Sequence, residues 1–114
     1  MPNNDSQIET TFNALADPTR LAVIRTLSNG PAAVSQLAQP FEMALPSFTQ
    51  HLGVLEDAGL ISSERKGRMR ICYLNVDALG LAEDWLAVHR RQAIGRLDRL
   101  EAHLDQQQKA EPYE

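Results

Sequence analysis

The fold is decided by residues 45–75, LPSFTQHLGVLEDAGLISSERKGRMRICYLN, in which the spacing of apolar residues changes once. In the first half, apolar residues recur every three or four positions, at Leu45, Phe48, Leu52 and Leu55. This spacing predicts a helix over about 46–57, closed by Ala58-Gly59. In the second half, two runs that suit strands, 60–65 and 69–75, flank a glycine, which predicts a β-hairpin with its turn at 66–68.

Two helices are predicted near the start of the chain. The S-x-x-E pattern at residues 6–9 has the form of a capping box and predicts a helix over about 7–16. Asp17 and Pro18 predict the N-cap and the first residue of a second helix, which ends near Ser28. The residues of this second helix that we expect to face the core are Leu21, Ile24 and Leu27.

A short third helix and a long last helix complete the prediction. The short helix has its apolar positions at Val34, Leu37, Ala38 and Phe41. The last helix, which Asp77 can cap, carries an apolar stripe made of Ala82, Trp85, Leu86, His89, Ala93, Leu97, Leu100 and Leu104. From about Gln106 the chain is polar, so we expect a disordered tail over 106–114 after a single domain of residues 1–105.

The predicted order of elements is α-α-α-α-β-β-α, a mainly α fold with a small β-hairpin. Two short helices separated by a tight turn, then a hairpin with a basic tip, are typical of a winged helix-turn-helix. A chain of 114 residues fits one domain. A domain of this size buries roughly two-thirds of its unfolded surface, so dimerisation would add needed stability.

Composition and charge exclude several classes of protein. The net charge of −4 argues against a general polyanion binder, yet four of the 11 lysines and arginines lie within positions 65–70. A single cysteine, Cys72, excludes an internal disulfide and a multi-cysteine zinc site. No apolar run is long enough to cross a bilayer, and residues 1–7 lack the pattern of a signal peptide. We therefore expect a cytoplasmic protein that is not bound to a membrane.

The chain also lacks the motifs that would predict an enzyme. It has no glycine-rich phosphate loop, no serine elbow and no clustered pair of acids. We therefore expect a binding protein with no catalytic residues.

A resemblance to one known family extends over about residues 12–104, and five stretches carry it. They are FNALADPTR at 12–20, VSQLA at 34–38, LPSFTQHL at 45–52, LEDAGLI at 55–61, and Gly67-Arg68 with Tyr73. Through them the chain resembles the ArsR/SmtB family of small dimeric bacterial repressors. The resemblance implies a homodimer on double-stranded DNA, with residues 46–57 of each protomer in successive major grooves of a pseudo-palindromic operator and each hairpin alongside.

The resemblance is closer to family members without metal-site motifs than to those that sense a metal. It therefore implies no cofactor, and it does not identify an inducing ligand. Repression, as opposed to activation, is implied by the family alone.

Four polar residues of the helix over 46–57 are candidates for DNA contact: Ser47, Thr49, Gln50 and His51. At about 100° per residue, Gln50 points away from the apolar side, with Ser47 and Thr49 at its flanks. Gln50 can pair bidentately with adenine, and the two hydroxyls can reach base edges or phosphates. His51 lies nearer the core edge. The alternative is a solvated face with a half-buried histidine.

Gly53 departs from the family pattern, in which a lysine is common at this place. The lysine's phosphate contact is therefore missing. A glycine inside a helix costs about 0.5–1 kcal/mol relative to alanine. Its missing side chain either permits a close approach to DNA or is simply tolerated.

The hairpin supplies a second group of DNA-binding candidates, which are Arg65, Lys66, Arg68 and Arg70. At a hairpin tip, such side chains can meet phosphates or a minor groove. Alternating strand residues cannot all face one way, so we expect two or three of the four to touch DNA. The alternative is an exposed turn that its charge keeps soluble.

The long apolar stripe is the expected dimer surface. Its candidate residues are Ile8, Phe12 and Leu15 of the first helix with Trp85, His89, Leu97, Leu100 and Leu104 of the last. The alternative is a stripe that folds back on its own domain. Arg20 has two interpretations as well, a phosphate contact or a pairing with Asp17, and we favour the pairing.

Two further functions stay open as alternatives. The first is a winged-helix module that binds an acidic protein and has no specific DNA site. The second is a repressor gated by a metal, with His89, the nearby Asp84 and His103 meeting across a dimer axis as ligands, or by oxidation of Cys72. The histidine spacing does not match the family's metal sites, and the strand position of Cys72 predicts a partly buried, inert thiol.

Overall fold

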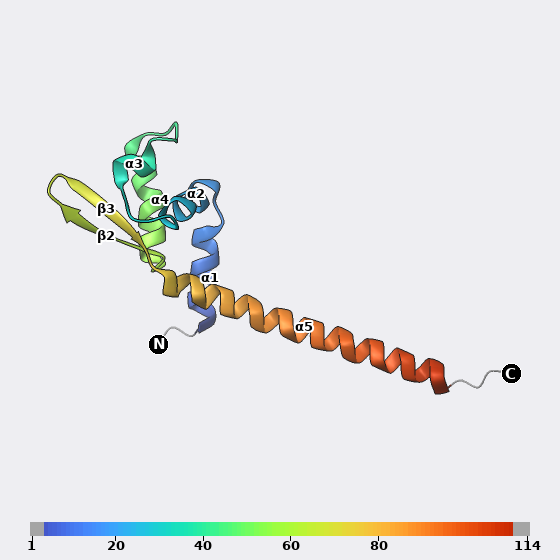
Figure 1. The fold of residues 1–114 in the computed structure, drawn as a ribbon. Coiled ribbons are helices and arrows are strands. Elements are labelled where there is room, and N and C mark those ends of the chain that lie inside the picture. The colour runs from blue at the N-terminus through green and yellow to red at the C-terminus, as the bar shows by residue number, and fades with distance from the viewer. Residues whose placement is uncertain (1–3, 111–114) are drawn as a thin grey trace. The chain divides into compact units, whose positions relative to one another are not determined.

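The structure is a computed structural model that describes residues 4–110. Its elements are α1 (Asn4–Leu15), α2 (Pro18–Leu27), β1 (Ala32–Ala33), α3 (Val34–Ala38), α4 (Leu45–Asp57), β2 (Ile61–Lys66), β3 (Met69–Leu74) and α5 (Val76–Ala110) (Figure 1). Contacts divide the chain into two units, Met1–Ala82 and Glu83–Glu114. The first unit holds every element from α1 to β3 and the start of α5.

The start of α2 forms as predicted, but the start of α1 does not. Asp17 is the N-cap of α2, where its carboxylate accepts a hydrogen bond from the backbone N–H of Arg20, and Pro18 follows in the first turn. α1 begins at Asn4, so Ser6 lies inside the helix and does not cap it. The carbonyl oxygen of Ser6 accepts a hydrogen bond from the Thr10 hydroxyl one turn later.

The first unit is built around one core, which is mostly aliphatic and includes Phe48. Its buried cluster consists of Ala14, Val23, Ile24, Leu27, Leu37, Phe48, Leu52, Leu55, Leu60, Ile61, Cys72 and Ala78. Two predicted core residues are wrong, because Leu21 is 46% exposed and Leu45 is 56% exposed. Leu45 is the first residue of α4, and the buried residues of that helix begin one turn later, at Phe48. In α2, Val23 is buried in place of Leu21.

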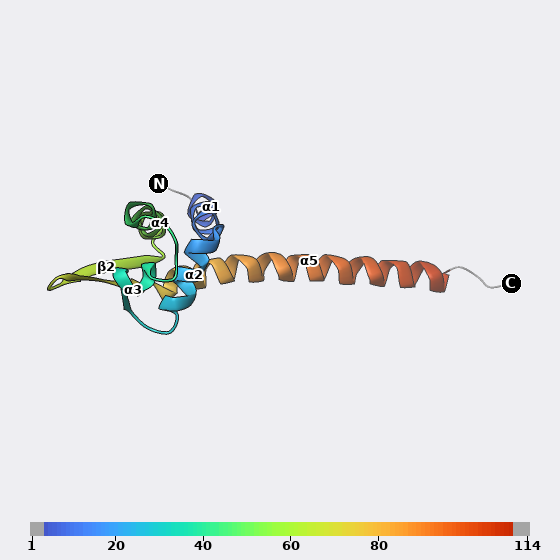
Figure 2. The same ribbon diagram turned by 90° about the horizontal axis from the view of Figure 1, so that it is seen from above.

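The sheet has three strands, of which two are predicted. Its order is β1-β3-β2, and both pairings are antiparallel. β1 is missed by the sequence pattern because two alanines are too short to show any alternation; they pair with Ile71 and Cys72 of β3. α4 lies against one face of the hairpin and also packs on α1 and α2, which holds the helix and the hairpin together in one unit (Figure 2).

α5 is one continuous helix of 35 residues. It runs through Ala110 and so includes residues 106–110, where a polar tail is expected; residues 111–114 lie outside the described part of the chain. The reason is local, since the sequence from Asp98 to Ala110 contains good helix formers and no glycine or proline. No helix in residues 4–110 is both long and apolar enough to span a bilayer.

Candidate nucleic-acid interface

The outer face of α4 presents the three polar side chains that its helical period predicts. Ser47, Thr49 and Gln50 are exposed, whereas Phe48, Leu52 and Leu55 of the same helix are buried in the core. The Thr49 hydroxyl donates a hydrogen bond of 3.0 Å to the Pro46 carbonyl in the first turn. This face therefore offers hydroxyl and amide groups to a partner, while the opposite face of α4 is packed in the core.

The end of α4 is shaped by a glycine in a left-handed conformation. Gly59 has φ +76°, which a residue with a side chain rarely adopts. Its N–H bonds the Glu56 carbonyl at 2.9 Å, and the Leu60 N–H bonds the Leu55 carbonyl at 3.0 Å. This closure turns the chain directly from α4 into β2 and sets where the hairpin begins relative to the helix.

His51 points toward the start of α2. Its Nδ1 lies 3.1 Å from Nη1 of Arg20 and 3.7 Å from a carboxylate oxygen of Asp17, and the side chain is only 25% exposed. A guanidinium can only donate, so Nδ1 accepts this hydrogen bond. His51 therefore joins α4 to α2, which agrees with its predicted place near the core edge.

Arg20 and Asp17 complete this junction. The Arg20 side chain donates from Nε to the Ala14 carbonyl at 2.6 Å and from Nη2 to the Asn13 carbonyl at 3.2 Å, which ties it to the end of α1. The bond from the Arg20 backbone N–H lowers the pKa of Asp17, and the nearby His51 and Arg20 side chains act in the same direction. The sequence predicts a structural role for Arg20; its side-chain partners are carbonyl groups and His51, while Asp17 takes the backbone N–H.

The hairpin divides its charged residues between two faces. Arg65 pairs with Arg70 across the strands, and Lys66 pairs with Met69, so the two arginines share one face and Lys66 takes the other. On the Lys66 face, the Tyr73 hydroxyl donates to Glu64 at 2.8 Å, and Lys66 lies 3.3 Å from the same carboxylate oxygen. The bonds from Tyr73 and Lys66 lower the pKa of Glu64, the Tyr73 bond most strongly. The pKa of Lys66 is raised first by its interaction with Tyr73 and then by Glu64.

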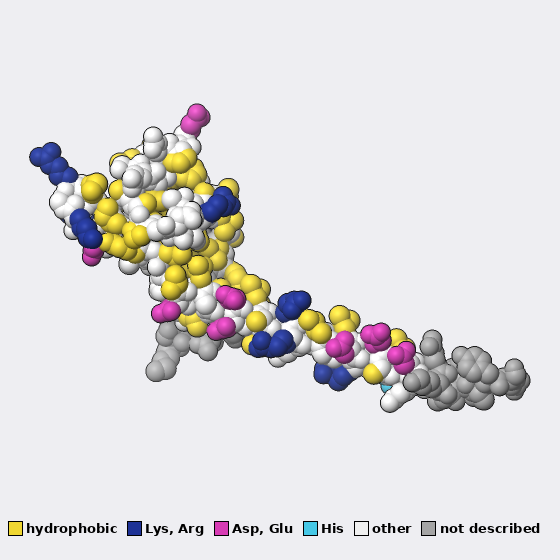
Figure 3. Space-filling model, in the orientation of Figure 1, with side chains coloured by type: hydrophobic (Ala, Val, Ile, Leu, Met, Phe, Trp, Pro, Cys, Tyr) yellow, Lys and Arg dark blue, Asp and Glu magenta, His cyan; other side chains and the backbone are white. Residues whose placement is uncertain are grey.

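The tip of the hairpin is basic and exposed. Gly67 adopts φ +65° in the turn, which requires glycine, and Arg68 follows it. Arg65 and Arg68 are both exposed, and Arg65 makes only a long contact of 3.5 Å with the Gly67 carbonyl. Figure 3 shows lysine and arginine side chains over the end of the hairpin.

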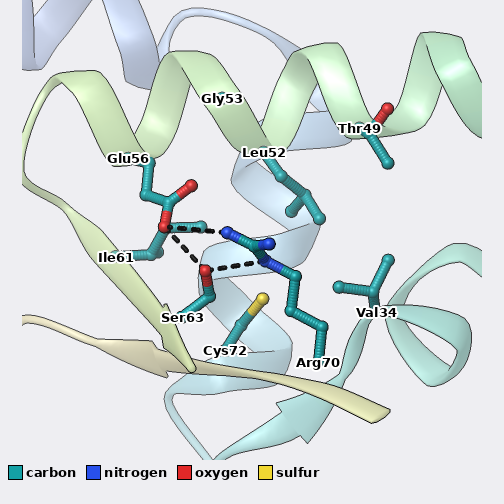
Figure 4. Close-up of a pocket in the computed structure, with 9 residues that line it drawn as sticks. All are labelled: Val34, Thr49, Leu52, Gly53, Glu56, Ile61, Ser63, Arg70 and Cys72. Atoms are coloured by element: carbon teal, nitrogen blue, oxygen red, sulfur yellow. Dashed lines mark hydrogen bonds and ion pairs between the residues drawn. The ribbon is translucent and has the colours of Figure 1, made fainter. Parts of the chain in front are cut away.

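Arg70 turns back from the hairpin toward α4. Its Nε donates to the Ser63 hydroxyl at 2.9 Å, and its Nη2 lies 3.9 Å from the Glu56 carboxylate of α4 (Figure 4). Ser63 in turn donates to Glu56 at 2.7 Å. The sequence analysis did not identify Glu56 or Ser63 as part of this site. Ser63 can be placed on the same strand face as Arg70 only when the strand register is known, and Glu56 lies on the side of α4 next to that face.

Cys72 is buried at the base of the same face, with 1% of its surface exposed. Burial raises the pKa of its thiol, and the nearby Glu56 carboxylate adds to the effect. A protonated thiol is a poor nucleophile and a poor metal ligand. The strand position predicts a partly buried thiol, and the structure buries it more completely. Among the described residues, no group of three histidine, cysteine or acidic side chains is placed to hold a metal ion.

The residues predicted for a dimer surface behave differently in the two units. In α1, Ile8 is buried, Leu15 packs against the core of its own unit, and Phe12 is half-buried. On α5, the remaining candidates are exposed along the helix: Trp85, His89, Leu97, Leu100 and Leu104. The larger exposed apolar surface therefore belongs to α5.

Comparison with known proteins identifies relatives for most of the chain. Residues 15–64 match a family described as a helix-turn-helix domain. The chain is 33% identical over 75 residues to the transcriptional repressor SdpR of Bacillus subtilis (strain 168). The aligned region covers 66% of this chain and 83% of SdpR. A crystal structure of an ArsR family transcriptional regulator matches with 47% identity and a TM-score of 0.75, over 81% of this chain and 95% of that one.

A solution structure from Mycobacterium bovis has the same fold. It is described as a homodimeric winged helix-turn-helix DNA-binding domain and matches with a TM-score of 0.61 and 22% identity, over 81% of this chain and 91% of that one. At this identity the likeness concerns the fold alone.

Proposed function

The chain belongs to the ArsR/SmtB family of winged helix-turn-helix transcriptional regulators, and from this premise we propose that it is a repressor that binds a pseudo-palindromic DNA operator as a homodimer. It acts as a binding protein in the cytoplasm and not as an enzyme. The observation that carries the proposal is the pairing, in one unit, of the polar outer face of α4 with the basic hairpin tip.

In this proposal α4 enters the major groove. Gln50, at the centre of the outer face, pairs with a base, and Ser47 and Thr49 contact base edges or phosphates at its flanks. His51 supports the helix from behind through Arg20, and any contact it makes with DNA is secondary to that role.

The hairpin contacts the sugar–phosphate backbone or the minor groove. Arg65 and Arg68 supply these contacts because both are exposed near the tip. Lys66 lies on the opposite face of the hairpin from Arg65, and so contributes less. Contacts of this kind position the protein on the duplex and carry no sequence information directly.

Dimerisation places two such units on one operator. The exposed apolar stripe of α5 supplies the surface. A two-fold dimer requires half-sites about one helical turn apart, which is the source of the pseudo-palindrome.

Fluorescence anisotropy on two duplexes tests this function. One duplex carries the DNA upstream of the protein's own gene, and the other is a scrambled version of it, both at near-physiological salt. We expect a preference for the upstream duplex of about 10³-fold or more. Equal weak binding to both duplexes would contradict the proposal and favour a winged-helix module for an acidic protein partner.

The same assay tests the role of Gln50. Gln50→Ala is expected to weaken binding to the upstream duplex by about 5- to 100-fold, because a good bidentate pair is worth about 1–3 kcal/mol of base discrimination. Binding to the scrambled duplex should stay unchanged. An equal loss on both duplexes would remove Gln50 from the residues that read bases.

A further inference from the structure

A hollow of about 310 Å³ lies between α4 and the hairpin. α4 contributes Thr49, Gly53 and Glu56, and the two strands contribute Ser63 and Arg70 with the Cys72 thiol at the base (Figure 4). The hollow is flanked by the two elements that the proposed function places on DNA. A sugar–phosphate strand that follows the groove edge beside α4 passes between these elements.

The guanidinium of Arg70 borders this hollow and has N–H donors that are not hydrogen-bonded within the described part of the chain. Its Nε is hydrogen-bonded to Ser63, but its Nη2 lies 3.9 Å from Glu56, which is beyond hydrogen-bond distance. A guanidinium has five N–H donors, so Arg70 keeps donors for a further acceptor. Its side chain is 62% exposed, which leaves it accessible from solvent.

The Glu56 carboxylate lies where a bound phosphate would lie, beside this guanidinium. Its carboxylate accepts a hydrogen bond from Ser63 at 2.7 Å and forms the long ion pair with Arg70. Solvent-exposed ion pairs of this kind contribute little to stability, so Arg70 is held only weakly to Glu56. A phosphate oxygen, by contrast, can accept two parallel N–H bonds from a guanidinium at hydrogen-bond distance.

Gly53 leaves the α4 side of the hollow uncovered. Apart from Gly53, its two chain neighbours and the nearby backbone of α4, no atom of the protein lies within 4 Å of the place where its Cβ would be, so the helix backbone borders open space there. The fold around Gly53 would accept a side chain, so the glycine is not explained by crowding within the chain. Its effect is to allow a partner close to the helix beside Arg70.

We propose that this hollow seats one phosphate of the DNA backbone and that the Arg70 guanidinium exchanges the Glu56 carboxylate for that phosphate when DNA binds. The inference rests on the proposed function, because it places a duplex against α4 and the hairpin. Glu56 is then a competitor of DNA, and removing its charge strengthens binding. A Glu56 that only positions the hairpin would have the opposite effect when replaced.

The test is a set of variants measured by anisotropy on the upstream and the scrambled duplex. Glu56→Gln is expected to tighten binding to both by about 3- to 30-fold, since a dimer has two such ion pairs and phosphates are present in any sequence. The matched control is Asp57→Asn, which removes the same charge from the next residue of α4, an exposed position outside the hollow. We expect this control to change affinity by about 2-fold or less.

A double variant shows whether the effect acts through Arg70. In an Arg70→Gln background, Glu56→Gln is expected to give no more tightening than Asp57→Asn. The proposal is overturned if Glu56→Gln weakens binding, if it only equals the Asp57→Asn control, or if its full effect persists without Arg70. Melting temperatures of all variants identify any that fold poorly.

A direct measurement on the unmodified protein does not depend on these variants. The Nε–H resonance of Arg70 is expected to shift when a short scrambled duplex is added at low salt, and an unchanged resonance in the bound state overturns the proposal. Failure of the proposed function gives a different result, namely equal affinity of the unmodified protein for both duplexes. In that case the coupling between Glu56 and Arg70 still tests whether the hollow binds a DNA phosphate. If the protein binds neither duplex, both the proposed function and the phosphate site are overturned.

Discussion

At the scale of single residues, one junction links three helices through polar contacts. Asp17 caps α2, Arg20 reaches back to the last carbonyls of α1, and His51 brings in α4. Each contact satisfies a backbone or ring atom that would otherwise need water. The candidate DNA-reading helix is therefore held by hydrogen bonds on one flank and by the apolar core beneath.

Asp17→Ala is expected to lower the free energy of unfolding by about 1 kcal/mol at neutral pH, because the variant loses the N-cap bond. The folded-state pKa of Asp17 lies below the ordinary value of 3.8, so the charged carboxylate stabilises the fold above that pH. This contribution is lost as the pH falls through the lowered pKa, and the two proteins should then converge. Urea unfolding at a series of pH values measures the difference, and a constant gap down to the acid end would contradict the assignment.

His51→Ala is expected to reduce stability, because Arg20 loses an acceptor and α4 loses its link to α2. We expect a decrease in melting temperature of about 5–15 °C, corresponding to about 1.5–3 kcal/mol for one hydrogen bond to a charged group. Gln50→Ala, on the exposed face one residue earlier, serves as the control and should leave the melting temperature unchanged. A His51→Ala protein with unchanged melting temperature but lost base preference would instead make His51 a base-reading residue.

At the scale of elements, strand alternation decides which cations of the hairpin are available. Arg65 and Arg70 share the face toward α4, while Lys66 lies with Glu64 and Tyr73 on the other. The sequence predicts that two or three of the four basic residues touch DNA. The strand faces and ion pairs support Arg65 and Arg68 as the residues that contact DNA. The proposed exchange with Glu56 adds Arg70 as a third.

Arg68→Ala is expected to weaken binding to every duplex and to flatten its salt dependence. One phosphate contact per protomer contributes about 0.9 to the slope of log K against log salt concentration, so a dimer should lose about 2. Lys66→Ala is the matched control and should change the slope by less, because Lys66 lies on the opposite face of the hairpin from Arg65 and Arg70. Anisotropy titrations at several salt concentrations measure both slopes, and a larger change for Lys66→Ala would reverse this assignment.

The elements that were predicted well are those with strong local signals. The spacing of Phe48, Leu52 and Leu55 and the glycine of the turn were sufficient for α4 and the hairpin. β1 could not be predicted, because a two-residue strand exists only through its pairing with β3. The contact between Glu56 and Arg70 could not be predicted either, because it depends on how α4 lies against the sheet.

At the scale of the whole molecule, the chain combines a DNA-binding unit with a helix whose apolar residues need a partner. Leu97, Leu100 and Leu104 are each more than half exposed on α5. Burial of such a side chain is worth about 1.5–3 kcal/mol, so a stripe of them is a strong drive for association. Dimerisation and operator binding are then linked, because two half-sites are read only by the assembled pair.

The double variant Leu97→Ala and Leu100→Ala is expected to shift the protein toward monomer and to weaken operator binding by 10-fold or more. Each substitution removes apolar surface from the proposed dimer interface, and the loss applies in both protomers. Arg99→Ala, which lies off the stripe on the same helix, is the control. Sedimentation equilibrium measures the association, and a variant that remains fully dimeric would place the dimer surface elsewhere.

The position of the single tryptophan provides the protein with an internal optical probe. Trp85 lies on α5, in the second unit, with its ring centroid 4.2 Å from that of His89. All intrinsic tryptophan emission therefore originates outside the unit that carries α4 and the hairpin. A change in that emission when a duplex is added would report communication from the DNA-binding unit to α5, without any label attached to the protein.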